Sequence, residues 1–398
     1  MDASQARQET LPGRLVSLDA YRGFVMLLMA SEGLRIGEVA QSFANSPVWQ
    51  FLAYQVDHVQ WTGCSLWDLI QPSFTFMAGV ALAFSYVSRK AKGQTQSQML
   101  RHALVRSAAL VLLGVFLRSV GRPQTYWTFE DVLSQIGLGY TFLFLLAGTR
   151  PRTQAVAAGL LLFGYWLAFA LYPLPPQGFN YGSVGVEPTW HHLKGFAAHW
   201  DKNTNLAAAF DQWFLNLFPR EQRFVFNGGG YLTLSFIPSL ATMVLGLLAG
   251  GLLRGPRSGR EKARYLLALG VAGILAGSLL DWLGICPVVK RIWTPSWTLY
   301  SAGWASLLLS AFYSVIDLGG RKRWAFPLVV VGMNSIAMYV LAHLESGFIS
   351  ESLRTNLGQH WPEFLGRVYA PIVEQTAVLF VLWLVCYWMY RRKLFLRI

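Results

Sequence analysis

About ten stretches of mostly apolar side chains follow one another along the chain, each long enough, at roughly 17 to 25 residues, to cross a bilayer as a helix. Short polar segments with glycine, proline and basic residues separate them. The pattern predicts an all-α, polytopic integral membrane helix bundle, built as one domain over residues 1–398. The predicted spans are 20–40, 67–88, 102–120, 131–148, 154–172, 230–253, 263–283, 297–316, 325–344 and 369–390.

The longest segment outside these spans covers residues 173–229 and contains His191, His192 and His199 among aromatic residues. It is too short for a separate domain, so we expect it to form a cap of short helices inserted on the outer face. Two adjacent histidines with a third nearby can bind zinc, but no cysteine or acidic ligand pattern accompanies them. We therefore expect no metal site.

The composition agrees with a lipid environment. Hydrophobic residues make up 54% of the chain and charged residues 13%, about half the usual share in soluble domains. The mean hydropathy is +0.38. Too few charges are present to cover a water-soluble protein of this size, which argues against a soluble protein.

The net charge of +13 reflects clusters of Lys and Arg between the apolar stretches. With the N-terminus inside, about two thirds of the 33 Lys and Arg residues fall on the inner side, as the positive-inside rule requires. We therefore expect both termini in the cytoplasm and a membrane-lipid environment. No basic stripe or nucleic-acid-binding motif is present, so we expect no nucleic-acid partner. Residues 1–12 do not have the pattern of a signal peptide.

The candidate catalytic residues are concentrated in residues 56–72. This segment precedes the second predicted span and includes its first residues, at the outer surface. His58 can take a proton from an amine or hydroxyl near neutral pH. A carboxylate such as Asp68 can fix the tautomer of the imidazole and stabilise its protonated form. The alternative is an interfacial histidine beside a helix-capping aspartate.

Several short motifs in this chain resemble those of the heparan-α-glucosaminide N-acetyltransferase family and its bacterial relatives. Each motif alone is weak, but their order and spacing along nearly the whole chain are specific. They are His58, Trp61, Gly63, Asp68, Leu69 and Pro72, together with residues 15–23, 132–136, 290–296 and 332–339.

The resemblance implies an enzyme that moves an acetyl group from cytosolic acetyl-CoA to an amino sugar or glycan at the far side of the membrane. His58 would be the general base or a transient acetyl carrier, and these two roles stay open. Asp68 would orient His58, and Asn334 would donate a hydrogen bond to the thioester carbonyl.

The resemblance also implies residues that bind the two substrates. Trp61, Lys290 and Trp293 would shape the acceptor site. Asp19, Arg22 and Gln135 would bind the acetyl-CoA donor, although Asp19 and Arg22 are also typical of a structural pair at a helix end. The implied location is a bacterial inner membrane, where heparan itself is not the expected acceptor, and a homodimer is one expected assembly.

Two further polar residues within or near spans are candidates for substrate binding. A carboxylate such as Glu32 is costly within a span and can bind a cationic amino sugar, the alternative being a pair with Arg35. His343, followed by Glu345, is expected in the polar interior of the bundle. Cys64 can act as a nucleophile in principle, but a packed thiol is the preferred interpretation.

Two other classes of function compete with the acetyltransferase. One is a multi-pass transporter or flippase for a sugar or lipid-linked substrate, without covalent chemistry. The other is a membrane scaffold that has lost activity. The spacing of His58 and Asp68 favours the enzyme, since a generic carrier has no need of it.

Overall fold

The computed structural model describes residues 15–396 and contains no named β-strand within them, only an isolated bridge between Thr62 and Val289. The predictions that residues 1–12 are not a signal peptide and that both termini are cytoplasmic concern residues outside this range. The helices are α1 (Val16–Ala30), α2 (Ile36–Gln41), α3 (Pro47–Gln55), α4 (Ile70–Ala91), α5 (Gln96–Ser119), α6 (Val132–Ala147), α7 (Pro151–Leu171), α8 (Leu206–Phe214), α9 (Phe236–Arg254), α10 (Gly259–Trp282), α11 (Pro295–Phe312), α12 (Phe326–Gly332), α13 (Ser335–Leu357) and α14 (Ala370–Arg391).

The predicted all-helical membrane bundle is confirmed, with fewer full-length spans than predicted. Seven helices of the described chain are long and apolar enough to cross a membrane, or eight if α12 and α13, bent by 81°, form one broken span. All ten predicted segments contain helix, but α1 has 15 residues and α6 has 16. Helices of that length reach only about 22–24 Å, less than the ~30 Å of a hydrocarbon core.

The first predicted span, 20–40, is interrupted because the chain turns left-handed after α1. Glu32, Gly33, Leu34 and Arg35 all have positive φ, between 47° and 63°. Such a conformation costs roughly 1–2 kcal/mol at each residue other than glycine. Arg35 anchors the turn, because its guanidinium binds the Glu374 carboxylate of α14 at 2.9 Å.

Close backbone contacts hold the bundle together. A Cβ atom at Gly79 of α4 would lie 1.8 Å from the Met243 carbonyl oxygen of α9, and one at Gly246 of α9 would lie 2.0 Å from that of Phe76. Membrane helices associate through such tight packing of small residues, because lipid supplies no hydrophobic drive between them. Helices α1 and α12 meet in the same way at Gly23 and Gly332.

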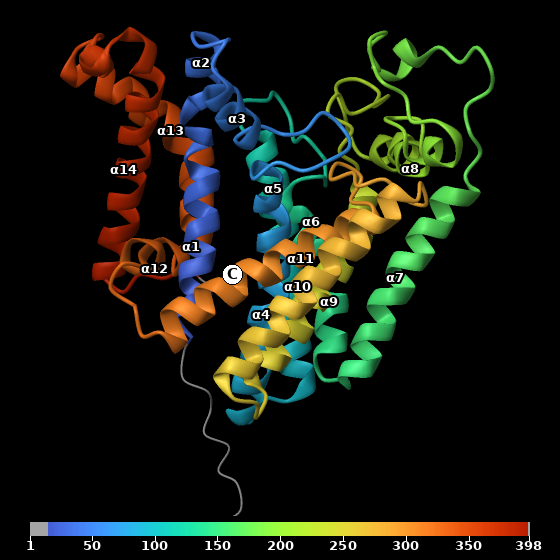
Figure 1. Ribbon diagram of the computed structural model, residues 1–398, viewed down its shortest axis with the longest axis horizontal. Coiled ribbons are helices and arrows are strands. Elements are labelled where there is room, and N and C mark those ends of the chain that lie inside the picture. Colours follow the sequence, from blue (N-terminus) through green and yellow to red (C-terminus); the bar gives the residue numbers. More distant parts are fainter. Residues whose placement is uncertain (1–14, 397–398) are drawn as a thin grey trace, which may run out of the picture.

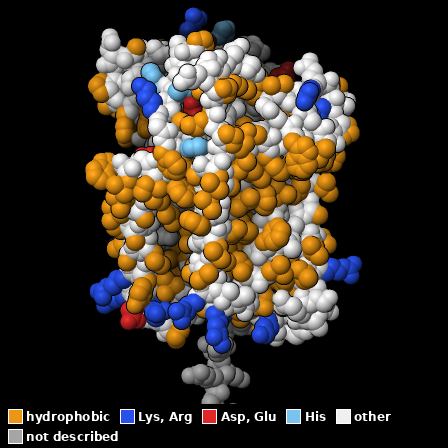
Figure 2. Space-filling view, turned by 90° about the vertical axis from the view of Figure 1, so that its right-hand side faces the viewer, with side chains coloured by type: hydrophobic (Ala, Val, Ile, Leu, Met, Phe, Trp, Pro, Cys, Tyr) orange, Lys and Arg blue, Asp and Glu red, His pale blue; other side chains and the backbone are white. Residues whose placement is uncertain are grey.

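The bundle has two distinct ends. In Figure 1, α1 and α12–α14 form one side and α4–α7 with α9–α11 the other, while α2, α3 and α8 lie at the upper end. This upper end carries residues 56–66 and 173–229 and is called the outer end, after the orientation that the sequence predicts. Figure 2 shows a belt of hydrophobic side chains with Lys and Arg along the lower rim, the inner end. Residues 173–229, referred to as the cap, form short helices: η4 (Tyr181–Val184), η5 (Gly195–Trp200), α8 and η6 (Leu215–Leu217).

Candidate active site

Two loops at the outer end hold each other in place. Residues 56–66 connect α3 to η3 (Trp67–Leu69), and residues 283–294 connect α10 to α11. Thr62 pairs with Val289, and the Gly63 backbone N–H donates to the Val288 carbonyl at 3.0 Å. Gly63 has a φ of 107°, a conformation that L side chains rarely adopt. The contact brings chemical groups from distant parts of the sequence to one place.

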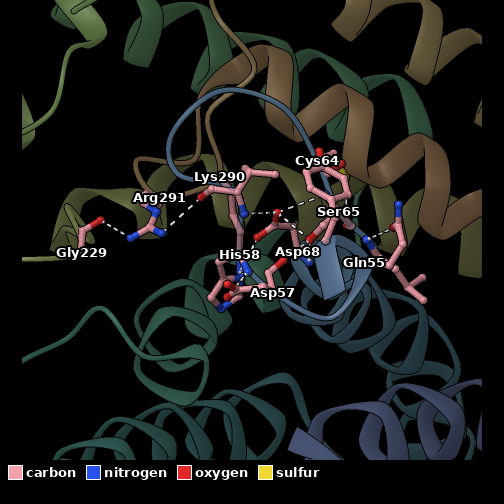
Figure 3. Close-up of polar contacts among 12 residues, drawn as sticks. Gln55, Asp57, His58, Cys64, Ser65, Asp68, Gly229, Lys290 and Arg291 are labelled. Carbon is pink, nitrogen blue, oxygen red and sulfur yellow. Dashed lines mark hydrogen bonds and ion pairs between the residues drawn. The ribbon is translucent and has the colours of Figure 1, made fainter. Parts of the chain in front are cut away.

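His58 and Asp68 form a hydrogen-bonded pair at this place (Figure 3). The His58 Nδ1 atom lies 2.7 Å from Asp68 Oδ1. The other oxygen, Oδ2, accepts the backbone N–H groups of Val59 and Ser65, both at 3.2 Å, and the Ser65 hydroxyl at 3.0 Å. The Asp68 side chain is only 1% exposed, whereas that of His58 is 34% exposed. A buried carboxylate, held by several hydrogen bonds, therefore orients an imidazole whose side chain stays partly exposed.

Lys290 completes the centre from the second loop. Its ammonium lies 3.2 Å from Asp68 Oδ1 and 3.0 Å from His58 Nδ1. Burial lowers the pKa of Lys290 to about 8, and the attraction of Asp68 opposes this shift. Lys290 is thus an interior partner of the carboxylate and does not stand on an open acceptor surface.

Arg291 and Tyr231 support the centre, and the sequence analysis assigned them no role. The Arg291 guanidinium donates to the carbonyls of Gly229 at 2.7 Å and Val59 at 3.2 Å (Figure 3). It lies over the Tyr231 ring, whose centre is 6.3 Å from that of the His58 ring. Arg291 lies within the motif 290–296, so the sequence contained an indication of its importance. No motif indicated a role for Tyr231.

A cleft of about 930 Å³ opens beside His58. Glu32, predicted to bind substrate, lines it. The two predicted acceptor-site tryptophans are buried elsewhere: Trp61 Nε1 donates to the Trp200 carbonyl of the cap, and Trp293 Nε1 donates to Thr242 of α9. The lining is Glu32, Arg35, Ile36, Gly37, Glu38, Gln41, Gln50, Ala53, Tyr54, Val56, Asp57, His58, Val59, Gln60 and Thr62.

A second cavity, of about 790 Å³, lies between α1, α4, α5, α6 and α13. Asp19 and Arg22, predicted to bind acetyl-CoA, line it. Three polar residues that the sequence analysis did not select, Arg89, His102 and Arg106, line it as well, and the Arg106 guanidinium lies over the Tyr140 ring. The rest of the wall is largely apolar. The cavity therefore combines cationic side chains with a largely apolar wall.

Three other residues that were predicted to belong to the site lie neither beside His58 nor on the walls of these two cavities. The Gln135 amide, predicted to bind the donor, is buried and donates to the Phe129 and Thr233 carbonyls. Asn334 lies at the break between α12 and α13, where Oδ1 accepts the Leu396 backbone N–H. His343 is exposed on α13 and not interior as expected, because its position places it on the outward face of that helix; its ring stacks on Tyr339.

The alternative nucleophile and metal candidates have different surroundings. Burial raises the pKa of the Cys64 thiol to about 12, so little nucleophilic thiolate forms near neutral pH. His192 Nδ1 lies 2.6 Å from Asp201 Oδ2, and His199 Nδ1 lies 2.9 Å from the Tyr172 carbonyl. Within residues 15–396, no group of three or more His, Cys, Asp or Glu residues is arranged to hold a metal ion.

Comparison with known proteins shows a distant full-length homology. No protein-family model matches the chain. It is 24% identical over 433 residues to the human protein named heparan-alpha-glucosaminide N-acetyltransferase, covering 98% of this chain and 61% of the relative. The mouse protein of that name is 24% identical over 427 residues, covering 97% and 60%. The chain thus spans about three fifths of the length of these relatives.

Proposed function

We propose that this protein is a membrane-bound acetyltransferase that moves an acetyl group from acetyl-CoA at the inner end to the amine of an amino sugar or glycan at the outer end. The observation that carries the proposal is the centre formed by His58, Asp68 and Lys290 beside an open cleft. The distant homology to proteins named N-acetyltransferases supports the same reaction class. The proposed setting is a bacterial inner membrane.

The cavity of the inner half suits the donor. Coenzyme A has a phosphorylated, anionic nucleotide part and a long, uncharged pantetheine arm. The guanidinium groups of Arg22, Arg89 and Arg106 can bind the phosphates, since arginine donates bidentate hydrogen bonds to them. The apolar wall then fits the pantetheine arm and directs the thioester into the bundle.

His58 would supply the base for the acceptor. With Nδ1–H donated to Asp68, Nε2 is free to accept the proton that the amine loses as its nitrogen attacks the thioester carbonyl. The carbon–sulfur bond then breaks, and the coenzyme A thiolate takes up a proton. In the alternative two-step scheme, Nε2 itself attacks the thioester and carries the acetyl group to the amine.

The two cavities have no lining residue in common. On α1 and the turn after it, the inner cavity reaches Met26 and the outer cleft begins at Glu32, six residues further along the chain. On α4, Phe74 lines the inner cavity, and Asp68 of η3 precedes it by six residues. Transfer therefore requires the cavities to join or an acetyl carrier between them.

Turnover in detergent tests the proposed reaction. Purified protein with acetyl-CoA and glucosamine is expected to release coenzyme A thiol together with an equal amount of N-acetylglucosamine. Mass spectrometry of the product and a thiol assay measure both. A transporter without covalent chemistry would release no thiol with any amine or glycan acceptor, and that outcome would reject the proposal.

A further inference from the structure

Helix α3 has two different faces, and one of them is a wall of the outer cleft. Gln50, Ala53 and Tyr54 line the cleft, at the spacing of one helical face. The rest of the helix surface presents Val48, 66% exposed, and Phe51, 62% exposed, neither of which lines the cleft. The helix contains no charged residue and buries none of its residues in the protein. An apolar face of this kind needs a nonaqueous neighbour.

The surroundings of α3 indicate that this neighbour is the membrane boundary. Trp49 stacks on Phe43 at 5.3 Å and contacts Tyr369 at 6.2 Å between ring centres. Tyr369 immediately precedes α14, one of the membrane-spanning helices. Tryptophan and tyrosine gather where a bilayer meets water. The aromatic rings that tie α3 to the outer end of a span are therefore the feature that favours a place for this helix in that interface.

Helix α3 is also hydrogen-bonded to residues 56–66, the loop that carries His58. The Tyr54 hydroxyl donates to the Cys64 carbonyl at 3.1 Å, and the Leu66 backbone N–H donates to Gln55 Oε1 at 2.9 Å. His58 follows the end of α3 by three residues. The cleft that holds His58 is therefore walled on one side by α3, so a molecule lying against α3 would be next to the imidazole.

The polar lining of the cleft favours a cationic group. Glu32, Glu38 and Asp57 contribute three carboxylates, of which Glu38 is paired with Arg35. The one guanidinium, that of Arg35, is already bound by Glu38 at 2.6 Å and by Glu374 at 2.9 Å. A primary amine in its ammonium form is attracted by such a lining, whereas a sulfated or phosphorylated group is repelled.

We propose that the acceptor is a primary amine carried on a membrane anchor, with the anchor in the outer leaflet against Val48 and Phe51 and the amine in the cleft at His58. This inference rests on the proposed acetyltransferase function and names its acceptor class. An amino sugar joined to a lipid has the required chemistry. Confinement to the leaflet also raises the concentration of the amine at the cleft mouth.

Spin labelling tests the position of α3 without any need for activity. In protein carrying Cys64→Ser and reconstituted into phosphatidylcholine vesicles, a nitroxide at Phe51→Cys should collide more with oxygen than with a water-soluble nickel chelate. The remaining Cys286 and Cys386 are buried. Leu217→Cys is the matched control, because Leu217 on the cap is also 62% exposed. Greater access of nickel at position 51 overturns the proposal, as does protection from both reagents, which would place a second protein copy there.

Kinetics in the same vesicles test the acceptor class. Dodecyl glucosaminide should show a kcat/KM at least about tenfold above that of methyl glucosaminide, because only the former partitions into the leaflet. Phe51→Glu should remove this advantage and leave methyl glucosaminide within about twofold, and Leu217→Glu should change neither. Equal values for the two acceptors in the wild type overturn the anchored-acceptor proposal while leaving the acetyltransferase intact. Absence of thiol release with both would reject the acetyltransferase itself, and this inference with it.

Discussion

Replacing His58 by alanine is expected to lower kcat for acetyl transfer by about 10²–10⁴-fold, the usual contribution of a general base. The imidazole is the one titratable group of the centre that is substantially exposed to the cleft, since Asp68 and Lys290 are both buried. Binding of acetyl-CoA should stay unchanged, because His58 does not line the inner cavity. Single-turnover thiol release and equilibrium binding of acetyl-CoA measure the two quantities.

The cap provides a matched control for this substitution. His192 is also 34% exposed and also lies within hydrogen-bond distance of a buried aspartate, Asp201, at 2.6 Å. His192→Ala removes the same type of pair at a site that lines neither cavity, so activity should remain within about twofold of wild type. If His58→Ala retained near wild-type activity, His58 would have no part in the mechanism.

Replacing Asp68 by asparagine is expected to have two effects. It should lower kcat by about 10²–10⁴-fold, because the amide does not hold the tautomer that leaves Nε2 free. It should also destabilise the fold by about 3–5 kcal/mol, because the buried Lys290 ammonium loses its carboxylate. Thermal or denaturant unfolding in detergent measures the second effect, and the turnover assay measures the first.

A second substitution separates these effects. Adding Lys290→Met to Asp68→Asn removes the uncompensated charge, so the double variant should regain much of the lost stability while activity stays low. Asp201→Asn is the control for loss of a buried carboxylate that binds a histidine, and it should spare activity. Recovery of activity together with stability in the double variant would show that Asp68 acts only on folding.

The sequence predicted the helical bundle and the local part of the site well. Apolar stretches of spanning length have few alternatives to helix in a membrane, because every backbone group must be satisfied internally. His58 and Asp68 are ten residues apart and lie in one motif, so their proximity follows from a single short loop. The motif at 290–296 also pointed to Lys290, although its partners 222 to 232 residues away could not be read from the sequence.

The predictions that differ from the structure depend on long-range geometry. Hydropathy does not reveal the left-handed turn at Glu32–Arg35, since it depends on the distant anchor Glu374. Asn334 and Gln135 are polar residues within apolar stretches of the sequence, which marks them as unusual without indicating their neighbours. Their amides bind backbone groups of residues 62 and 98 positions away, respectively. Only the packed bundle specifies those contacts.

The central claim is that one protein takes an acetyl group from a donor at the inner end and gives it to an amine at the outer end. Sided proteoliposomes test it most directly, with radiolabelled acetyl-CoA sealed on the side of the inner loops and glucosamine supplied only on the opposite side. Our account predicts labelled N-acetylglucosamine on the glucosamine side with wild-type protein and none with His58→Ala. Product that forms only when donor and acceptor share one side would contradict it.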